Sequence, residues 1–202
     1  MSTQENNVAT PFWKRLLFSQ TLLCRSRGKR TAYIAALTAF SVVANLFFEF
    51  KFMDTQYSLT IAVSCLLGVV LGPVFGFIAC FLGDLLGFLC NSGGFMYLPF
   101  VGISMGLTAF FAGLIVSVRL PVKGGIYIKL FAVCALSFFV CSVAINTTAF
   151  WWMYAKGVPY WEYFVARFIV KGQLFSCLVN YVLVFVFVPM LPKIKPLHIK
   201  IV

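Results

Sequence analysis

The chain has 202 residues, of which 62% are hydrophobic and 10% are charged, and its formal net charge is +11. Soluble domains carry about 25% charged residues, so this chain has too little polar surface to cover a globule in water. The composition excludes an ordinary soluble enzyme and predicts a protein that is embedded in lipid.

The chain begins with a basic tail, residues 1–30, which we expect to lie in the cytosol. The tail has no apolar core that ends at a small-residue cleavage site, so a removable signal peptide is not predicted. Residues 12–18 have the pattern of a short helix that lies on lipid headgroups.

Six apolar segments follow the tail. They lack the polar–apolar alternation of barrel strands, and a backbone in lipid must be hydrogen-bonded internally, so helices are favoured. The sequence therefore predicts an all-α membrane protein, a six-transmembrane-helix bundle over residues 31–192, with a short basic cytosolic tail over 193–202. Gly72 and Pro73 separate the second segment from the third. The predicted spans are 31–50, 57–71, 74–90, 98–118, 127–150 and 164–190.

The basic residues indicate the orientation of this bundle. Most of the 16 lie in the N-terminal tail, the loop over 119–129 and the C-terminal tail, which share one side of a six-span bundle. Because basic loops stay inside, both the N- and C-termini are predicted to be cytosolic. The charges sit at the ends of apolar segments and not on one face, so we expect a lipid bilayer as partner and no nucleic acid.

The chain lacks the residue sets of common catalytic and metal sites. Its single histidine, His198, lies in the C-terminal tail, and its seven cysteines include no C-x-x-C pair. We therefore expect neither an enzyme nor a metal site. There is also no G-x-x-x-x-G-K-[ST] motif, so we expect no cofactor on this chain and expect any ATP to be used by partner subunits.

Three ionisable side chains inside the predicted spans are candidates for ligand contacts. Asp84 lies mid-span, where a charge costs at least ~2.5 kcal/mol, so it either contacts a ligand or charge partner or forms a structural hydrogen bond between helices. Arg167 and Lys171 are four residues apart and share a helix face. Together they either bind a carboxylate or phosphate or reach toward the interface as anchors.

Asn146 ends the fifth predicted span and is followed by an aromatic-rich stretch that contains Trp151. This stretch is either an aromatic belt at the membrane interface or a stacking surface for a flat heterocycle whose polar edge Asn146 reads. Tyr97 is expected on the same side as a further wall. On the first span, Ala35 and Ala39 would let another helix approach closely, either in this chain or in another protein.

The order and spacing of three stretches cover most of residues 30–190. They resemble the substrate-binding S components of energy-coupling factor (ECF) vitamin transporters, in the folate-transporter-like branch. The stretches are Ala35-x-x-x-Ala39 with Ser41-Val42-Val43; Leu71-Gly72-Pro73-Val74-Phe75-Gly76 with Gly83-Asp84-Leu85-Leu86-Gly87-Phe88 and Gly93-Gly94; and Asn146-Thr147 with the Tyr154-x-x-Gly157 turn and Ala166-Arg167-Phe168-Ile169-Val170-Lys171.

The resemblance implies a subunit of the bacterial cytoplasmic membrane that captures a vitamin or precursor at the outer face. A folate- or pterin-like compound is the first guess for this ligand. The implied partners are a membrane coupling protein, the T component, which docks on Ala35 and Ala39, and two cytosolic ATPase subunits. The predicted substrate-binding residues are Asp84, Tyr97, Asn146, Trp151, Arg167 and Lys171.

The chain also departs from the folate branch. Residues 97–102 read Tyr-Leu-Pro-Phe-Val-Gly where folate carriers usually show a Phe-Pro-Gly-Phe-Thr-like stretch, and 106–113 hold no arginine. Another heterocyclic vitamin, a precursor or pantothenate therefore remains an alternative ligand. The alternative functions are a self-sufficient small transporter or channel, and a membrane enzyme or structural subunit.

Overall fold

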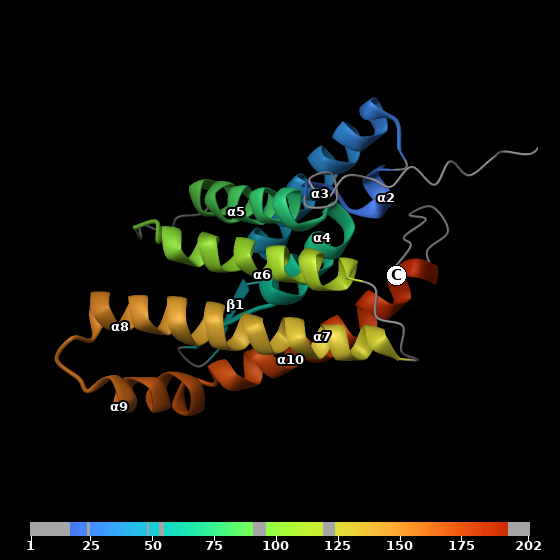
Figure 1. The fold of residues 1–202 in the computed structure, drawn as a ribbon. Helices are drawn as coiled ribbons and strands as arrows, with labels where there is room; N and C mark the ends of the chain where they lie inside the picture. The colour runs from blue at the N-terminus through green and yellow to red at the C-terminus, as the bar shows by residue number, and fades with distance from the viewer. Residues whose placement is uncertain are drawn as a thin grey trace, which may run out of the picture.

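The computed structural model of the chain describes residues 17–23, 25–47, 49–52, 55–90, 96–118 and 124–193. Helices make up most of this part, and one short two-stranded hairpin joins two of them (Figure 1). In chain order the elements are α2 (Gln20–Leu23), α3 (Arg27–Phe47), β1 (Glu49–Phe52), β2 (Thr55–Ser58), α4 (Thr60–Leu71), α5 (Pro73–Cys90), α6 (Pro99–Ser117), α7 (Gly125–Leu136), η1 (Ser137–Thr147), α8 (Thr148–Tyr154), α9 (Tyr160–Val165), η2 (Ala166–Val170), α10 (Gln173–Met190) and η3 (Leu191–Lys193).

Five helical segments in the described part of the chain are long and apolar enough to cross a membrane, as a multi-pass membrane protein requires. In the longest, Gly125–Tyr154, the elements α7, η1 and α8 form one continuous helix of 30 residues. The predicted second span corresponds to α4, which has 12 residues. At 1.5 Å per residue α4 reaches about 18 Å, short of the roughly 30 Å of a hydrocarbon core. It is instead buried along most of its length inside the bundle.

The long helices lie in successive layers (Figure 1). α5 packs on α6, α6 packs on the α7–η1–α8 helix, and α4 fills the centre against α5, α6 and α10. The largest apolar core joins α4, α7 and α10 through buried residues such as Val69, Val133 and Val184. α2 and η3 lie at one end of the bundle, which we call the terminal end. The connection between α8 and α9 lies at the opposite end, which we call the α8–α9 end (Figure 1).

Glycines bring the backbones of α4, α5 and α6 into direct contact. A Cβ on Gly68 would collide with the carbonyl oxygen of Ala109, and one on Gly113 would stand 2.6 Å from the backbone nitrogen of Pro73. Only small residues allow helices to approach this closely. These three helices therefore form a tightly joined unit at the centre of the fold.

The predicted sixth span, 164–190, is wrong as a single helix. The chain forms α9 and the π-helical η2 up to Val170, and α10 begins only at Gln173. Between them Gly172 has φ 66°, a left-handed conformation that breaks the helix and that glycine adopts without steric cost. Arg167 therefore lies in a short segment that is separate from α10.

The predicted first span, 31–50, is also shifted. α3 runs from Arg27 to Phe47, and the strands β1 and β2, which the all-α prediction did not include, pair antiparallel between α3 and α4. The fully buried Asn180 of α10 holds the end of this hairpin. Its Oδ1 accepts from the Ala62 N–H at 3.0 Å, and its Nδ2 donates to the Ser58 carbonyl at 2.7 Å.

The predicted tails fall only partly on described residues. Residues 1–16 and 194–202, and with them most of the predicted interfacial helix over 12–18, lie outside the described residues. The described remainder of the N-terminal tail is partly helical and packs against the bundle, with Leu22 fully buried.

Candidate functional site

Asp84, on α5, and Tyr97, just before α6, form a hydrogen-bonded pair toward the α8–α9 end. The Tyr97 hydroxyl donates to Asp84 Oδ2 at 3.1 Å. A Cβ on Gly102 would stand 2.7 Å from the Tyr97 hydroxyl and 2.8 Å from Asp84 Oδ2, so this pair needs a glycine at that position. Burial, with the Asp84 carboxylate beside it, raises the pKa of Tyr97. The phenol therefore stays protonated at neutral pH and remains a donor.

α6 and the antiparallel η1–α8 helix meet in two successive contacts at the same end. The rings of Phe100 and Phe150 pack edge-on with centroids 5.0 Å apart. One turn deeper, Asn146 Nδ2 donates to Ser104 Oγ at 2.9 Å, and the Ser104 hydroxyl donates to the Val101 carbonyl at 3.0 Å. This chain of bonds fixes the orientation of the Asn146 amide. Its Oδ1 is left buried without a hydrogen-bond partner.

Arg167 approaches the same region from η2. Its guanidinium lies over the ring of Phe150, with Cζ 4.5 Å from the ring centroid, a favourable cation–π contact. Its Nε is buried without a hydrogen-bond partner, and it makes no ion pair with any residue in the described part of the chain. Phe150 lies four residues after Asn146, about one helical turn. A buried acceptor and a buried donor, both unpaired, therefore lie near one aromatic ring.

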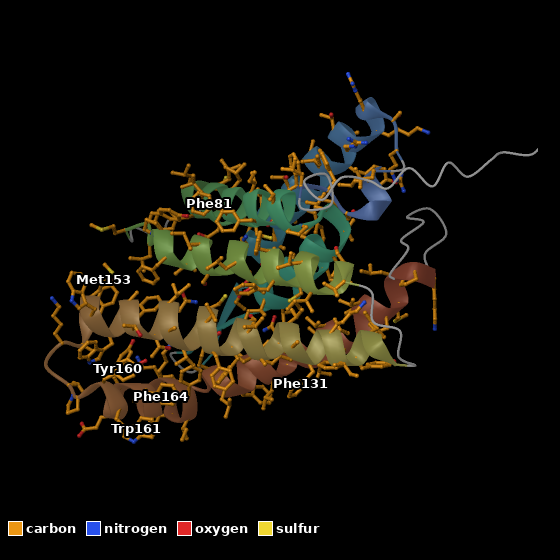
Figure 2. All side chains as sticks on the ribbon, in the orientation of Figure 1. Phe81, Phe131, Met153, Tyr160, Trp161 and Phe164 are labelled. Carbon is orange, nitrogen blue, oxygen red and sulfur yellow. The ribbon has the colours of Figure 1, made fainter. Side chains whose placement is uncertain are left out.

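Aromatic side chains join α8 to α9 around the connection between them. Trp151 donates its indole N–H to the Val158 carbonyl at 2.8 Å and packs edge-on against Tyr160 at 5.5 Å. The rings of Trp161 and Phe164 stack at 5.3 Å. Figure 2 shows Tyr160, Trp161 and Phe164 together on this part of the molecule. Trp151 thus holds the connection in place beside the site.

Comparison with known proteins identifies the family. A family model described as "ECF-type riboflavin transporter, S component" matches residues 26–195. The chain belongs to this family. The prediction from the sequence resemblance is therefore confirmed at the level of an ECF S component, which is a transporter subunit and not a member of an enzyme family.

A solved structure has a similar fold. It is the crystal structure of FolT bound with folic acid, with a TM-score of 0.60 and 20% sequence identity, over 77% of this chain and 90% of that chain. The comparison of this chain with curated protein sequences found no match.

The S component brings four of the six predicted site residues into two groups. Asp84 and Tyr97 are hydrogen-bonded to each other. Asn146 lies four residues before Phe150 on the same long helix, and the Arg167 guanidinium, from η2, lies over the Phe150 ring. Trp151 lies on the α8–α9 connection. Lys171 follows the end of η2, and its side chain is exposed. A role in ligand binding stays a prediction for all six.

The two predicted docking residues of the S component are both exposed. Ala35 and Ala39 lie on the outward face of α3, as do Ala32 and Ala36. The opposite face of α3 packs on the bundle. No described helix of this chain covers the alanine face, so a partner can reach it.

Sequence reasoning missed two polar residues of the interior. Ser104 determines which way the Asn146 amide points, and the hydroxyl of Tyr181, on α10, is buried without a hydrogen-bond partner. Serine is common in helices, so a single serine gives little signal. Phe100 and Ser104 are four residues apart, as are Asn146 and Phe150, but the register that places the two pairs opposite each other is seen only in the structure.

Proposed function

We propose that this S component captures a flat heterocyclic vitamin or vitamin precursor, folate- or pterin-like as the first guess, at its α8–α9 end. Support comes from the family description, which names riboflavin, and from the folic acid bound in the similar FolT structure. Both compounds contain a flat fused-ring system with polar edges. The surfaces of Phe100 and Phe150 are suited to such a ring.

The observation that carries the proposal is the pair of buried, unpaired polar atoms. Asn146 Oδ1 can only accept a hydrogen bond and Arg167 Nε can only donate one. A buried polar group without a partner costs about 1–3 kcal/mol, so a ligand that pairs both is favoured. A ring N–H would satisfy Asn146, and a ring carbonyl or a carboxylate would satisfy Arg167.

The test of this proposal is to identify the ligand directly. The protein is purified from cells grown in rich medium, and mass spectrometry identifies any small molecule that is released on denaturation. Isothermal titration then measures folate, riboflavin and pantothenate. We expect a co-purified vitamin-like compound and tight binding of at least one heterocycle. No binding across the panel and no co-purified compound would contradict the proposal.

The proposed machine contains further subunits. A T component would dock on Ala35 and Ala39, and two cytosolic ATPase subunits would use the ATP, while this chain itself would need no cofactor. Reconstitution in liposomes tests this arrangement. Vitamin uptake only when all partners are present is the expected result, and uptake by this chain alone would favour the self-sufficient transporter.

We further propose six membrane segments, with α4 as the short one, and both termini on the cytosolic side of a bacterial cytoplasmic membrane. The support is the set of basic side chains at the terminal end, among them Arg27, Lys29 and Lys193, because basic residues favour the inside. Lys193→Cys and Lys156→Cys variants, each with Cys24 and the exposed Cys90 replaced by serine, test the sidedness in intact cells. We expect an impermeant maleimide to label only the second.

A further inference from the structure

The segment Phe18–Leu23, which contains α2 and which we call the strap, caps the end of α4. The Ser19 N–H donates to the Leu71 carbonyl at 3.1 Å, and its hydroxyl donates to the Val70 carbonyl. The last carbonyls of a helix have no partner within the helix. The strap therefore satisfies groups that α4 leaves open at the terminal end.

The strap is packed as tightly as an interior segment. Gly72, between α4 and α5, has φ 98°, and a Cβ there would collide with the backbone nitrogen of Ser19. Leu22 is fully buried among residues of α4 and α5, and Phe18 stacks on Phe75 with ring centroids 4.7 Å apart. Part of the predicted cytosolic tail thus belongs to the folded body.

The other side of the strap is bonded to the first turns of α3. Arg30 Nε donates to the Leu22 carbonyl at 3.1 Å, and Arg30 Nη2 donates to the carbonyls of Leu23 and Arg25 at 3.3 Å. The same guanidinium lies over the Phe18 ring at 4.6 Å. The strap therefore fills the space between the start of α3 and the end of α4, as Figure 1 shows.

α3 has few other anchors in its first half. Its only buried residues are Ser41 and Ala44, both in the second half. The first half carries the exposed Ala35 on one face, and Ala39 follows just past the midpoint of the helix. On its other face the first half packs through Tyr33 and Ile34 on the cluster that contains Leu22 of the strap. The position of the Ala35 end of the alanine face thus depends on the strap.

We propose that the strap is a wedge that sets the angle of α3 and thereby positions the alanine face for the membrane partner. This rests on the proposed docking of a T component. The match to the family begins at residue 26, so the strap precedes the region that the family model covers. It acts on the docking helix from the side opposite to the partner.

The experiment compares Leu22→Asp with Leu17→Asp, because Leu17 is 39% exposed and takes the same new charge without entering the core. Spin labels on Lys29→Cys and Lys193→Cys, with Cys24 and the exposed Cys90 replaced by serine, report the distance between the start of α3 and η3. Co-purification reports assembly with the T component and ATPases, and titration reports vitamin affinity. The milder Arg30→Gln removes three hydrogen bonds without burying a charge and serves if Leu22→Asp does not fold.

We expect Leu22→Asp or Arg30→Gln to broaden or shift the distance distribution and to lower co-purification at least tenfold, with vitamin affinity changed less than twofold. Leu17→Asp should match the unmodified chain in all three measurements. An unchanged distance distribution in the strap variants would overturn the wedge. The wedge would also be overturned if the strap variants showed an altered distance distribution but still co-purified fully with the T component and ATPases. If the unmodified chain binds neither partners nor a vitamin, the proposed function fails, while the distance measurement still decides whether the strap sets the angle of α3.

Discussion

Arg167 lays its guanidinium on the ring of Phe150, with 4.5 Å between Cζ and the ring centroid, while its Nε remains buried and unpaired. The ring compensates part of the cost of burying the cation, but it accepts no directional hydrogen bond of carbonyl strength. The guanidinium therefore keeps one strong donor for a molecule that enters the site.

Replacing Arg167 with alanine should weaken ligand binding. Loss of a charge-assisted hydrogen bond costs roughly 1.5–3 kcal/mol, about 10- to 150-fold in Kd. Titration of Arg167→Ala against the best ligand of the panel measures this change. Lys156→Ala is the control, since that exposed lysine lies at the same end but on the ring of Trp152. If Arg167→Ala bound the ligand as tightly as Lys156→Ala does, Arg167 would be an interface anchor and not a ligand contact.

Asn146→Leu should lower affinity because it removes the buried acceptor Oδ1. Ser104→Ala should have a smaller effect, because it leaves the amide in place and removes only the bond that orients it. The same titration should give the largest Kd for Asn146→Leu, an intermediate Kd for Ser104→Ala and the smallest Kd for the unmodified chain. If Ser104→Ala were the more damaging change, the amide would be acting as a structural link between α6 and η1 and not as a ligand contact.

Gly102→Ala should destabilise the protein by about 1–3 kcal/mol, the usual cost of adding a methyl group to a packed interior. The new Cβ would meet the Tyr97–Asp84 pair at under 3 Å, while an alanine at Gly157 would meet nothing within 4 Å. Thermal unfolding in detergent should therefore show a lower Tm for Gly102→Ala and no change for Gly157→Ala. Equal Tm values would mean that the pair moves aside without cost.

Ala39→Trp should abolish uptake but leave ligand binding intact, because the bulky ring covers the exposed docking face of α3 and does not enter the interior of the bundle. Phe131→Trp is the matched control, since Phe131 is 69% exposed on α7. Uptake in reconstituted liposomes and titration of the isolated chain measure the two effects. Loss of ligand binding in Ala39→Trp would count against a docking role.

Asn180→Leu should loosen the β1–β2 hairpin. The substitution leaves the Ala62 N–H and the Ser58 carbonyl without their side-chain partner, at a cost of about 1–3 kcal/mol for each buried group. Hydrogen exchange should become faster over residues 55–62 and remain slow in the centre of α6. Asn180→Asp keeps the acceptor for Ala62 and should show a smaller increase. Unchanged exchange in Asn180→Leu would mean that the hairpin is held by other contacts.

The sequence predicted the long helices well, because lipid imposes long apolar segments and strong breakers such as Gly72 separate them. It did not predict the hairpin between α3 and α4 or the break at Gly172. Residues 164–190 are mostly apolar, with only two cations and a few uncharged polar residues, and a single left-handed glycine gives no hydropathy signal. The shortness of α4 was visible in the length of the second segment, but its burial depends on helices that lie far away in the chain.

The sequence predicted some residues of the candidate site because of their polarity. Asp84, Asn146 and Arg167 stand out because polar groups at membrane depth are costly and therefore rare. Their pairing with Tyr97, Ser104 and Phe150 depends on the register between helices that are not adjacent in sequence. The direction of Trp151, which holds the α8–α9 connection, could not be read from an aromatic-rich stretch for the same reason.

The direct backbone contacts among α4, α5 and α6 have a consequence for redesign of this protein. Where Gly68 touches Ala109 there is no layer of side chains that can be exchanged, so mutagenesis there can only break the scaffold. The walls contributed by η1, α8 and η2 are made of side chains and can be varied. A library directed at those walls, with the central three helices left untouched, is the economical route to an importer subunit with a new cargo.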